Sequence, residues 1–180
     1  MNRTDIINEL IEARELKSYL EIGVRNKADN FDKIKCGRKL GVDVKLEAVG
    51  IKTMSSAEFW EQNGKRSWGL IFLDGGHDYE TAKADLLAAA RVVQKKGVIV
   101  MHDCLPKNEA EGAPFRRPGG SPWCGQVWRV WAECVDGVIV DCDHGVGIVQ
   151  DICPVSAELA VPPWKDRNLY EIIKPEDWHA

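Results

Sequence analysis

The chain has 180 residues, 44% of them hydrophobic, and its 24 Lys and Arg against 28 Asp and Glu give a net charge of −4. A chain of this length suits one domain, residues 1–180, with a sizeable core, and the scattered basic residues argue against a nucleic-acid partner. No run approaches the roughly 20 apolar residues that span a bilayer, and the N-terminus lacks the apolar segment of a secretory signal, so we expect a cytoplasmic protein with no membrane partner.

The cysteines of the chain form no C-x-x-C pair. They are Cys36, Cys104, Cys124, Cys134, Cys142 and Cys153. Neither a zinc ribbon nor a redox dithiol is therefore indicated. We expect reduced thiols that are mostly buried.

Short apolar runs alternate with helical segments in the first half of the chain. In order, the pattern predicts a helix over residues 4–14, a strand over 19–24, a helix over about 30–38, strands over 40–44 and 49–54, and a short helix from 55 to about 64. Ser55 and Glu58 have the S-x-x-E spacing of a capping box, which indicates where the last of these helices begins.

The second half continues this alternation as far as a long loop. We expect a strand over residues 68–73, a helix over 79–95 stopped by Gly97, a strand over 98–101, a helix over 123–135, and strands over 137–141 and 145–149. Residues 104–122 are rich in Pro and Gly, and a loop of this length is either a lid or disordered. The tail, residues 154–180, shows no clear period.

Strands that alternate with helices predict an α/β fold with a doubly wound, mostly parallel sheet and helices on both faces. The strands over 137–141 and 145–149 have no helix between them. They therefore predict a C-terminal antiparallel hairpin.

Acidic and histidine residues follow two of the predicted strands. Asp74 and His77 come after the strand over 68–73, and His102 and Asp103 after the strand over 98–101. Ligands of an open parallel sheet bind outside the carboxyl ends of its strands, so these groups are expected at one cleft.

Glu21 and Gly23 end the first strand, and Asp43 ends the second. A glycine lets the backbone approach a ligand, and an acid about 20 residues later can take ribose hydroxyls, so this pattern resembles part of a nucleoside site. Residues 25–27 lack the further glycines of a dinucleotide site, which favours a nucleoside without phosphate over a nicotinamide cofactor. Alternatively, both acids cap helices or solvate strand ends.

Several motifs together resemble a known family. They are Tyr-Leu-Glu-Ile-Gly at 19–23, Gly-Val-Asp at 41–43, Asp-Gly-Gly-His-Asp-Tyr-Glu at 74–80, Asp-Leu at 85–86 and Val-Met-His-Asp at 100–103. In this order and spacing, over about residues 18–149, they resemble the class I S-adenosylmethionine-dependent methyltransferases. The resemblance is strongest to the small-molecule and sugar O-methyltransferase branch that includes the macrocin O-methyltransferases, and it implies a Rossmann-like sheet.

The resemblance implies S-adenosylmethionine as the cofactor and assigns residues to it. Glu21 and Gly23 would flank its methionine and ribose, and Asp43 would bind the ribose hydroxyls. Ser55 or Ser56 would lie near the adenine, although the first role of Ser55 is that of an N-cap. Asp74 also counts among the cofactor-binding residues. The glycine-rich loop of the family is reduced here to Gly23.

The resemblance also implies a metal at Asp74, His102 and Asp103. Carboxylates with one imidazole suit Mg²⁺, which could bind substrate oxygens and lower the pKa of the attacking hydroxyl. His77 would accept the hydroxyl proton, and Asp74 is the second expected catalytic residue. Alternatively, Asp74 caps the following helix and His102 is a buried residue at a strand end.

We therefore expect an O-methyltransferase that acts on a small polar molecule, such as a sugar or glycan precursor, bound under the loop of residues 104–122. A non-catalytic nucleoside-binding module and an NAD-linked oxidoreductase of the same fold are the alternatives. Trp164, Tyr170 and Trp178 of the tail pack either on the domain or on a second subunit of a homo-oligomer.

Overall fold

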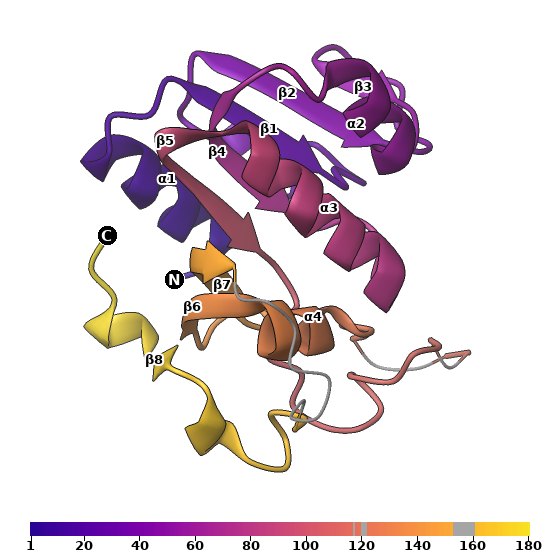
Figure 1. Cartoon of the computed structure of the whole chain (residues 1–180), viewed down its shortest axis with the longest axis vertical. Helices are drawn as coiled ribbons and strands as arrows, with labels where there is room; N and C mark the ends of the chain where they lie inside the picture. Colours follow the sequence, from indigo (N-terminus) through magenta and orange to yellow (C-terminus); the bar gives the residue numbers. More distant parts are fainter. Residues whose placement is uncertain (117, 120–121, 153–160) are drawn as a thin grey trace. The chain divides into compact units, whose positions relative to one another are not determined.

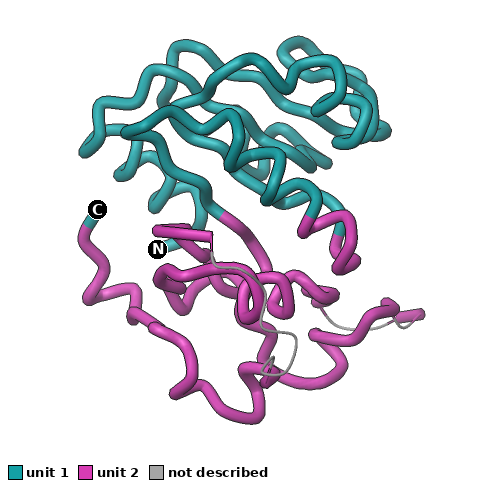
Figure 2. Tube along the Cα trace, viewed as in Figure 1, with its two compact units in different colours: residues 1–76, 84–100, 180 teal, residues 77–83, 101–179 magenta. Residues whose placement is uncertain are grey.

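The computed structural model describes residues 1–116, 118–119, 122–152 and 161–180. It divides into two compact units, which Figure 2 distinguishes by colour. Unit 1 comprises residues 1–76, 84–100 and 180, and unit 2 comprises residues 77–83 and 101–179. The single domain expected over residues 1–180 stays a prediction.

Unit 1 is built on parallel strands (Figure 1). Its elements are α1 (Arg3–Ala13), β1 (Ser18–Ile22), η1 (Phe31–Lys33), β2 (Arg38–Asp43), β3 (Ile51–Thr53), α2 (Ser56–Asn63) and β4 (Trp68–Leu73), followed by most of α3 (Tyr79–Val92) and of β5 (Val93–Met101). The strand order is β3-β2-β1-β4-β5, and β1 pairs in parallel with both β2 and β4. The predicted α/β fold with a mostly parallel sheet is thus confirmed.

Every residue of β1 and of β4 is buried. A parallel strand that is covered on both faces reads as a nearly continuous apolar run, which is why these two strands were visible in the sequence. In the registers, Ile22 is the partner of both Val42 and Leu73. The carboxyl ends of β1, β2 and β4 therefore meet at one edge of the sheet.

The helix predicted over residues 30–38 is wrong, because the structure has only the short 3-10 helix η1 there. Asn30 turns its side chain to buried polar groups, and its backbone at φ −141° is not helical. Lys39 donates to the carbonyl oxygens of Phe31 and Ile34 at 2.7 and 3.0 Å, which replaces hydrogen bonds that a longer helix would make.

The helix predicted over residues 79–95 ends earlier than expected. α3 stops at Val92, and β5 begins at Val93, so Gly97 lies inside a strand and does not stop a helix. A Cβ at Gly97 would lie 2.5 Å from the carbonyl oxygen of Gly69. This glycine serves a close approach of two backbones.

Unit 2 contains the predicted hairpin. Its elements are α4 (Val127–Cys134), β6 (Val135–Val140), β7 (Val146–Ile152), η2 (Arg167–Leu169), β8 (Ile172–Ile173) and η3 (Pro175–Asp177). β6 and β7 pair antiparallel, as expected, and β8 pairs in parallel with β6, giving the order β7-β6-β8. The tail therefore supplies a strand that its sequence pattern did not indicate.

The described part of the loop 104–122 forms no helix or strand. Cys104, Leu105 and Glu111 are nevertheless buried, so its first half is packed within unit 2. All cysteines of the described residues are free, and Cys153 lies outside those residues. Within the described ranges, no helix is long and apolar enough to cross a membrane.

Candidate active site

The rim of unit 1 is formed by the carboxyl ends of β1, β2 and β4. Gly23 leaves β1 with φ +88°, and its N–H donates to the carbonyl oxygen of Val42 at 2.8 Å. The N–H of Asp74 donates to the carbonyl oxygen of Ile22 at 2.9 Å. A Cβ at Gly23 would lie 2.1 Å from the carbonyl oxygen of Asp74, so only glycine fits where the chain leaves β1.

Asp43 joins the loops that follow β1 and β2. Its carboxylate accepts backbone N–H groups of Arg25, Lys45 and Leu46 at 2.7, 2.8 and 2.9 Å. Partial burial raises the pKa of Asp43, but these hydrogen bonds outweigh it and hold the pKa below its usual value. A carboxylate offers about four acceptor positions. Asp43 is thus charged at neutral pH and keeps capacity for a further donor.

Glu21 lies inside a closed polar network of unit 1 and is only 2% exposed. Tyr19 donates its hydroxyl to Glu21 at 2.5 Å, and the Asn30 amide donates to the same carboxylate at 3.0 Å. Thr4 in turn donates to Asn30 at 2.8 Å. Burial is the main reason that the pKa of Glu21 rises to about 7.

The sequence pattern did not indicate the partners of Glu21. Tyr19 and Glu21 are two residues apart on a strand and so share one face, which was a usable signal. Asn30 carries no such signal, because the pattern around it predicts a helix that does not form.

Ser55 is the N-cap of α2, as predicted. Its hydroxyl accepts the N–H of Glu58 at 3.2 Å, and the Glu58 carboxylate accepts the N–H of Ser55 at 2.9 Å. The predicted contact of Ser55 with an adenine ring stays a prediction.

In unit 2, Asp103 lies between two histidines. Its Oδ2 is 3.4 Å from Nε2 of His77 and 3.3 Å from Nδ1 of His102. Asp103 and His102 are both buried. Burial raises the pKa of Asp103, but the hydrogen bond and charge of His102, together with the charge of His77, bring it below its usual value. His102 also approaches Asp143, with Nε2 and Oδ2 3.6 Å apart.

The orientation of His77 is set by Trp123. The Nδ1 of His77 lies 3.0 Å from the carbonyl oxygen of Trp123, and the two rings stack with centroids 5.1 Å apart. A carbonyl oxygen only accepts, so Nδ1 carries the proton of the neutral ring. Nε2 is then the basic nitrogen, as the predicted role of His77 requires.

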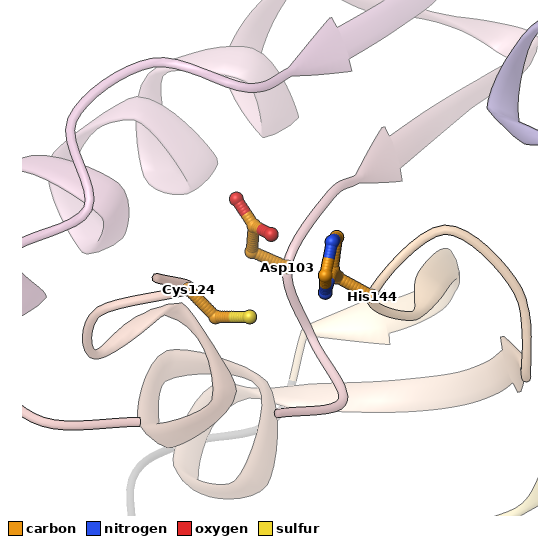
Figure 3. Close-up of side chains that lie close together, drawn as sticks. All are labelled: Asp103, Cys124 and His144. Carbon is orange, nitrogen blue, oxygen red and sulfur yellow. The ribbon is translucent and has the colours of Figure 1, made fainter. Parts of the chain in front are cut away.

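The predicted metal ligands fall in both units. Asp74 belongs to unit 1, and the adjacent pair His102 and Asp103 belongs to unit 2. The complete set of three stays a prediction. Two further candidates near Asp103, Cys124 and His144, were missed, since one lies before a helix and the other in a turn (Figure 3).

Comparison with known proteins identifies the segment that carries the rim. The sequence from residue 20 to residue 104 matches a family described as "Methyltransferase domain". The matched segment makes up somewhat less than half of the chain. This stretch contains Glu21, Gly23, Asp43, Ser55 and Asp74. No curated protein matches the sequence.

Solved structures share the fold of this chain. An O-methyltransferase from Bacillus cereus, in complex with SAH, superposes with a TM-score of 0.57 at 13% identity, covering 82% of this chain and 80% of that chain. A protein described as a caffeoyl-CoA O-methyltransferase from Staphylococcus aureus has a TM-score of 0.56 at 16% identity, with coverages of 83% and 81%. The SAH-bound methyltransferase PaMTH1 of Podospora anserina has a TM-score of 0.50 at 17% identity, with coverages of 79% and 76%. The expected Rossmann-like fold is confirmed, and the match over residues 20–104 fits the expected methyltransferase resemblance.

Proposed function

We propose that this methyltransferase transfers the methyl group of S-adenosylmethionine to a hydroxyl oxygen of a small polar acceptor. The observation that carries the proposal is the rim of unit 1, where Gly23 and Asp43 lie at adjoining strand ends within the matched domain. Two of the structural neighbours were solved with SAH, the demethylated cofactor, which supports this choice of methyl donor.

The residues of the rim fit the proposed cofactor. The backbone at Gly23 has no side chain to block a ligand, and Asp43 is a charged carboxylate with an acceptor position to spare for ribose hydroxyls. We assign Glu21 and Gly23 to the methionine and ribose, Ser55 to the adenine side, and Asp74 to the same rim. Glu21 reaches a ligand only through its second carboxylate oxygen, because its hydrogen-bond partners Tyr19 and Asn30 both occupy Oε2.

His77 is the proposed base. When bound, the sulfonium cofactor supplies an activated methyl group: the acceptor oxygen forms the new bond to carbon, and the carbon–sulfur bond breaks with its electron pair going to sulfur. The hydroxyl proton goes to Nε2 of His77, while Nδ1 stays bonded to the Trp123 carbonyl. Orientation of the acceptor is the other main contribution of the chain.

We also propose that Asp74, His102 and Asp103 hold Mg²⁺. The donor set of two carboxylates and an imidazole suits this cation, and Asp103 is charged because its pKa is low. A bound Mg²⁺ would lower the pKa of the acceptor hydroxyl.

The acceptor, in this proposal, is a sugar or glycan precursor bound near residues 104–122. In the first half of that loop, Cys104, Leu105 and Glu111 are buried. The proposal includes a cytoplasmic location and no nucleic-acid or membrane partner, and it leaves a homo-oligomer open.

A non-catalytic nucleoside-binding module is the second candidate. It is favoured by one observation at Arg25, where the family has glycines. The N–H of Arg25 donates to the Asp43 carboxylate at 2.7 Å, which fixes the loop. An NAD-linked oxidoreductase is disfavoured, because residues 25–27 lack the glycines that cradle a diphosphate.

Calorimetry and a methyl-transfer assay separate these candidates. We expect S-adenosylmethionine and its demethylated product to bind, and Asp43→Ala to abolish binding, while Glu47→Ala, an exposed acid of the same loop, leaves it unchanged. Labelled methyl groups should then appear on members of a panel of hydroxylated acceptors. Cofactor binding without transfer to any acceptor would favour the binding module, and equal binding by Asp43→Ala would refute the ribose assignment.

A further inference from the structure

Unit 2 contains a cluster of ligating side chains that shares Asp103 with the proposed magnesium set and differs from that set by including a thiol. A carboxylate oxygen of Asp103, Sγ of Cys124 and a ring nitrogen of His144 all lie within 4.8 Å of one another (Figure 3). The three residues come from separate segments: the end of β5, the approach to α4, and the turn between β6 and β7. Their convergence is a product of the fold of unit 2.

We propose that Asp103, Cys124 and His144 form a binding site for a borderline transition-metal ion, Zn²⁺ in the first place. A thiolate with an imidazole and one carboxylate is a ligand set that suits Zn²⁺, whereas Mg²⁺ takes oxygen ligands and does not favour sulfur. The inference does not depend on methyl transfer, since it concerns a ligand set and not a reaction.

The segment of Cys124 is held in place by its own backbone. The N–H groups of Cys124 and Gly125 donate to the carbonyl oxygen of Glu111 at 2.9 and 3.1 Å, and the N–H of Gln126 donates to that of His77 at 2.7 Å. Gly125 has φ +62°, and a Cβ there would lie 2.3 Å from the His77 carbonyl oxygen. The sulfur is therefore presented by a rigid turn.

Two of the three ligands have strained backbones. Asp103 has φ +60° and His144 has φ +66°, a left-handed conformation that residues other than glycine adopt uncommonly. The carbonyl oxygen of His144 accepts the N–H of Leu105 at 2.9 Å, and Gly145 next to it has φ +89°. Strain of this kind persists where the surrounding structure holds it and is common at ligand sites.

The polar atoms of the cluster leave room for a cation. Nδ1 of His144 is buried and has no hydrogen-bond partner among the described residues. Cys124 is buried too, and burial raises the pKa of its thiol well above the usual range. Without a metal the sulfur therefore keeps its proton and donates a hydrogen bond to Asp103. Zn²⁺ would take the place of that proton, which is released to solvent.

The three ligand atoms need to move only a little closer together to bind Zn²⁺. Zinc–ligand bonds of about 2.0–2.3 Å in a tetrahedron place the ligand atoms about 3.3–3.8 Å apart, so the cluster would contract by about 1 Å. Three protein ligands leave a fourth position for water, as in zinc sites that are open to solvent. Nε2 of His77, 3.4 Å from Oδ2 of Asp103, is placed to hydrogen-bond such a water.

Cobalt substitution tests the site with a readout independent of activity. The chain of residues 1–180 is stripped of metal and titrated with Co²⁺, and we expect a thiolate-to-cobalt charge-transfer absorption that saturates at one equivalent. Zn²⁺ should displace it, and excess Mg²⁺ should not. Cys124→Ser should lose the absorption, whereas the control Cys134→Ser, a buried cysteine of α4, should keep it.

A second pair of variants separates this site from the proposed magnesium set. His144→Ala, in the turn between β6 and β7, should weaken Co²⁺ and Zn²⁺ binding by at least about tenfold while circular dichroism shows an unchanged fold. Asp74→Asn should bind both ions as the wild type does, even if it loses methyl transfer. Absence of the absorption in the wild type, or its persistence in Cys124→Ser, would overturn the proposal.

Discussion

Gly23 and Asp74 come so close that a Cβ on residue 23 would lie 2.1 Å from the carbonyl oxygen of Asp74. The contact joins the ends of β1 and β4, which are paired in parallel. It explains why the sharp bend after β1 requires a residue without a side chain. The same bend opens the rim on which the proposed cofactor site depends.

Gly23→Ala should therefore be strongly destabilising. The φ of +88° alone costs a residue with a side chain on the order of 1–3 kcal/mol, and the overlap with Asp74 adds to it. Chemical denaturation should show the loss, and calorimetry should show that cofactor binding is lost as well. Gly37→Ala is the matched control, because nothing lies within 4 Å of a Cβ at that position. Equal effects of the two substitutions would contradict this account.

Glu21 should make the stability of the protein depend on pH. Its pKa is raised from 4.5 to about 7 in the folded state, so the folded protein binds the proton more tightly than the unfolded chain does. The stability from this group is complete below pH 4.5 and is lost as pH rises toward 7, by up to about 3 kcal/mol. Urea unfolding between pH 4.5 and pH 8 measures the slope. Glu21→Gln should reduce the dependence of the unfolding free energy on pH. A dependence equal to that of the wild type would show that other groups cause it.

Substitutions of Ser55 distinguish its role as the N-cap of α2 from its proposed contact with the adenine. Ser55→Ala removes the acceptor for the N–H of Glu58 and should cost about 1 kcal/mol of stability, and Ser55→Asp should restore most of it. Thermal unfolding measures both. If Ser55 also faces the adenine, cofactor affinity should fall in both variants. If cofactor affinity instead falls in Ser55→Ala and recovers with stability in Ser55→Asp, Ser55 is only a cap.

His77→Ala should lower kcat for methyl transfer by about 100-fold or more, because a positioned base contributes on that scale. The affinity for S-adenosylmethionine should stay unchanged, and added imidazole should restore part of the rate. His179→Ala, which removes an exposed histidine of the tail, is the control. A normal kcat in His77→Ala would mean that another group accepts the proton of the acceptor hydroxyl.

Removal of divalent cations tests the set of Asp74, His102 and Asp103. A chelator should reduce methyl transfer, added Mg²⁺ should restore it, and Asp74→Asn should raise the Mg²⁺ concentration needed for half of the full rate. Transfer at the same rate with and without chelator would exclude a metal from the reaction.

The sequence by itself determined the features that depend on neighbouring residues. The capping box of Ser55 and Glu58 is satisfied within one turn, and β1 and β4 are continuous apolar runs because both of their faces are covered. Gly23 and Asp43 were readable for the same reason, since each follows directly from the end of a strand. The expected methyltransferase domain rests on these local motifs.

Only the tertiary structure decided the features that join distant segments. Asn30 leaves the predicted helix because it bonds to Glu21, and Gly97 serves the approach of Gly69, a residue 28 positions earlier. Cys124 and His144 reach Asp103 through turns whose conformations depend on hydrogen bonds with remote backbone groups. Periodicity and capping report the backbone within a few residues, whereas these contacts depend on which strands and turns the folded chain brings together.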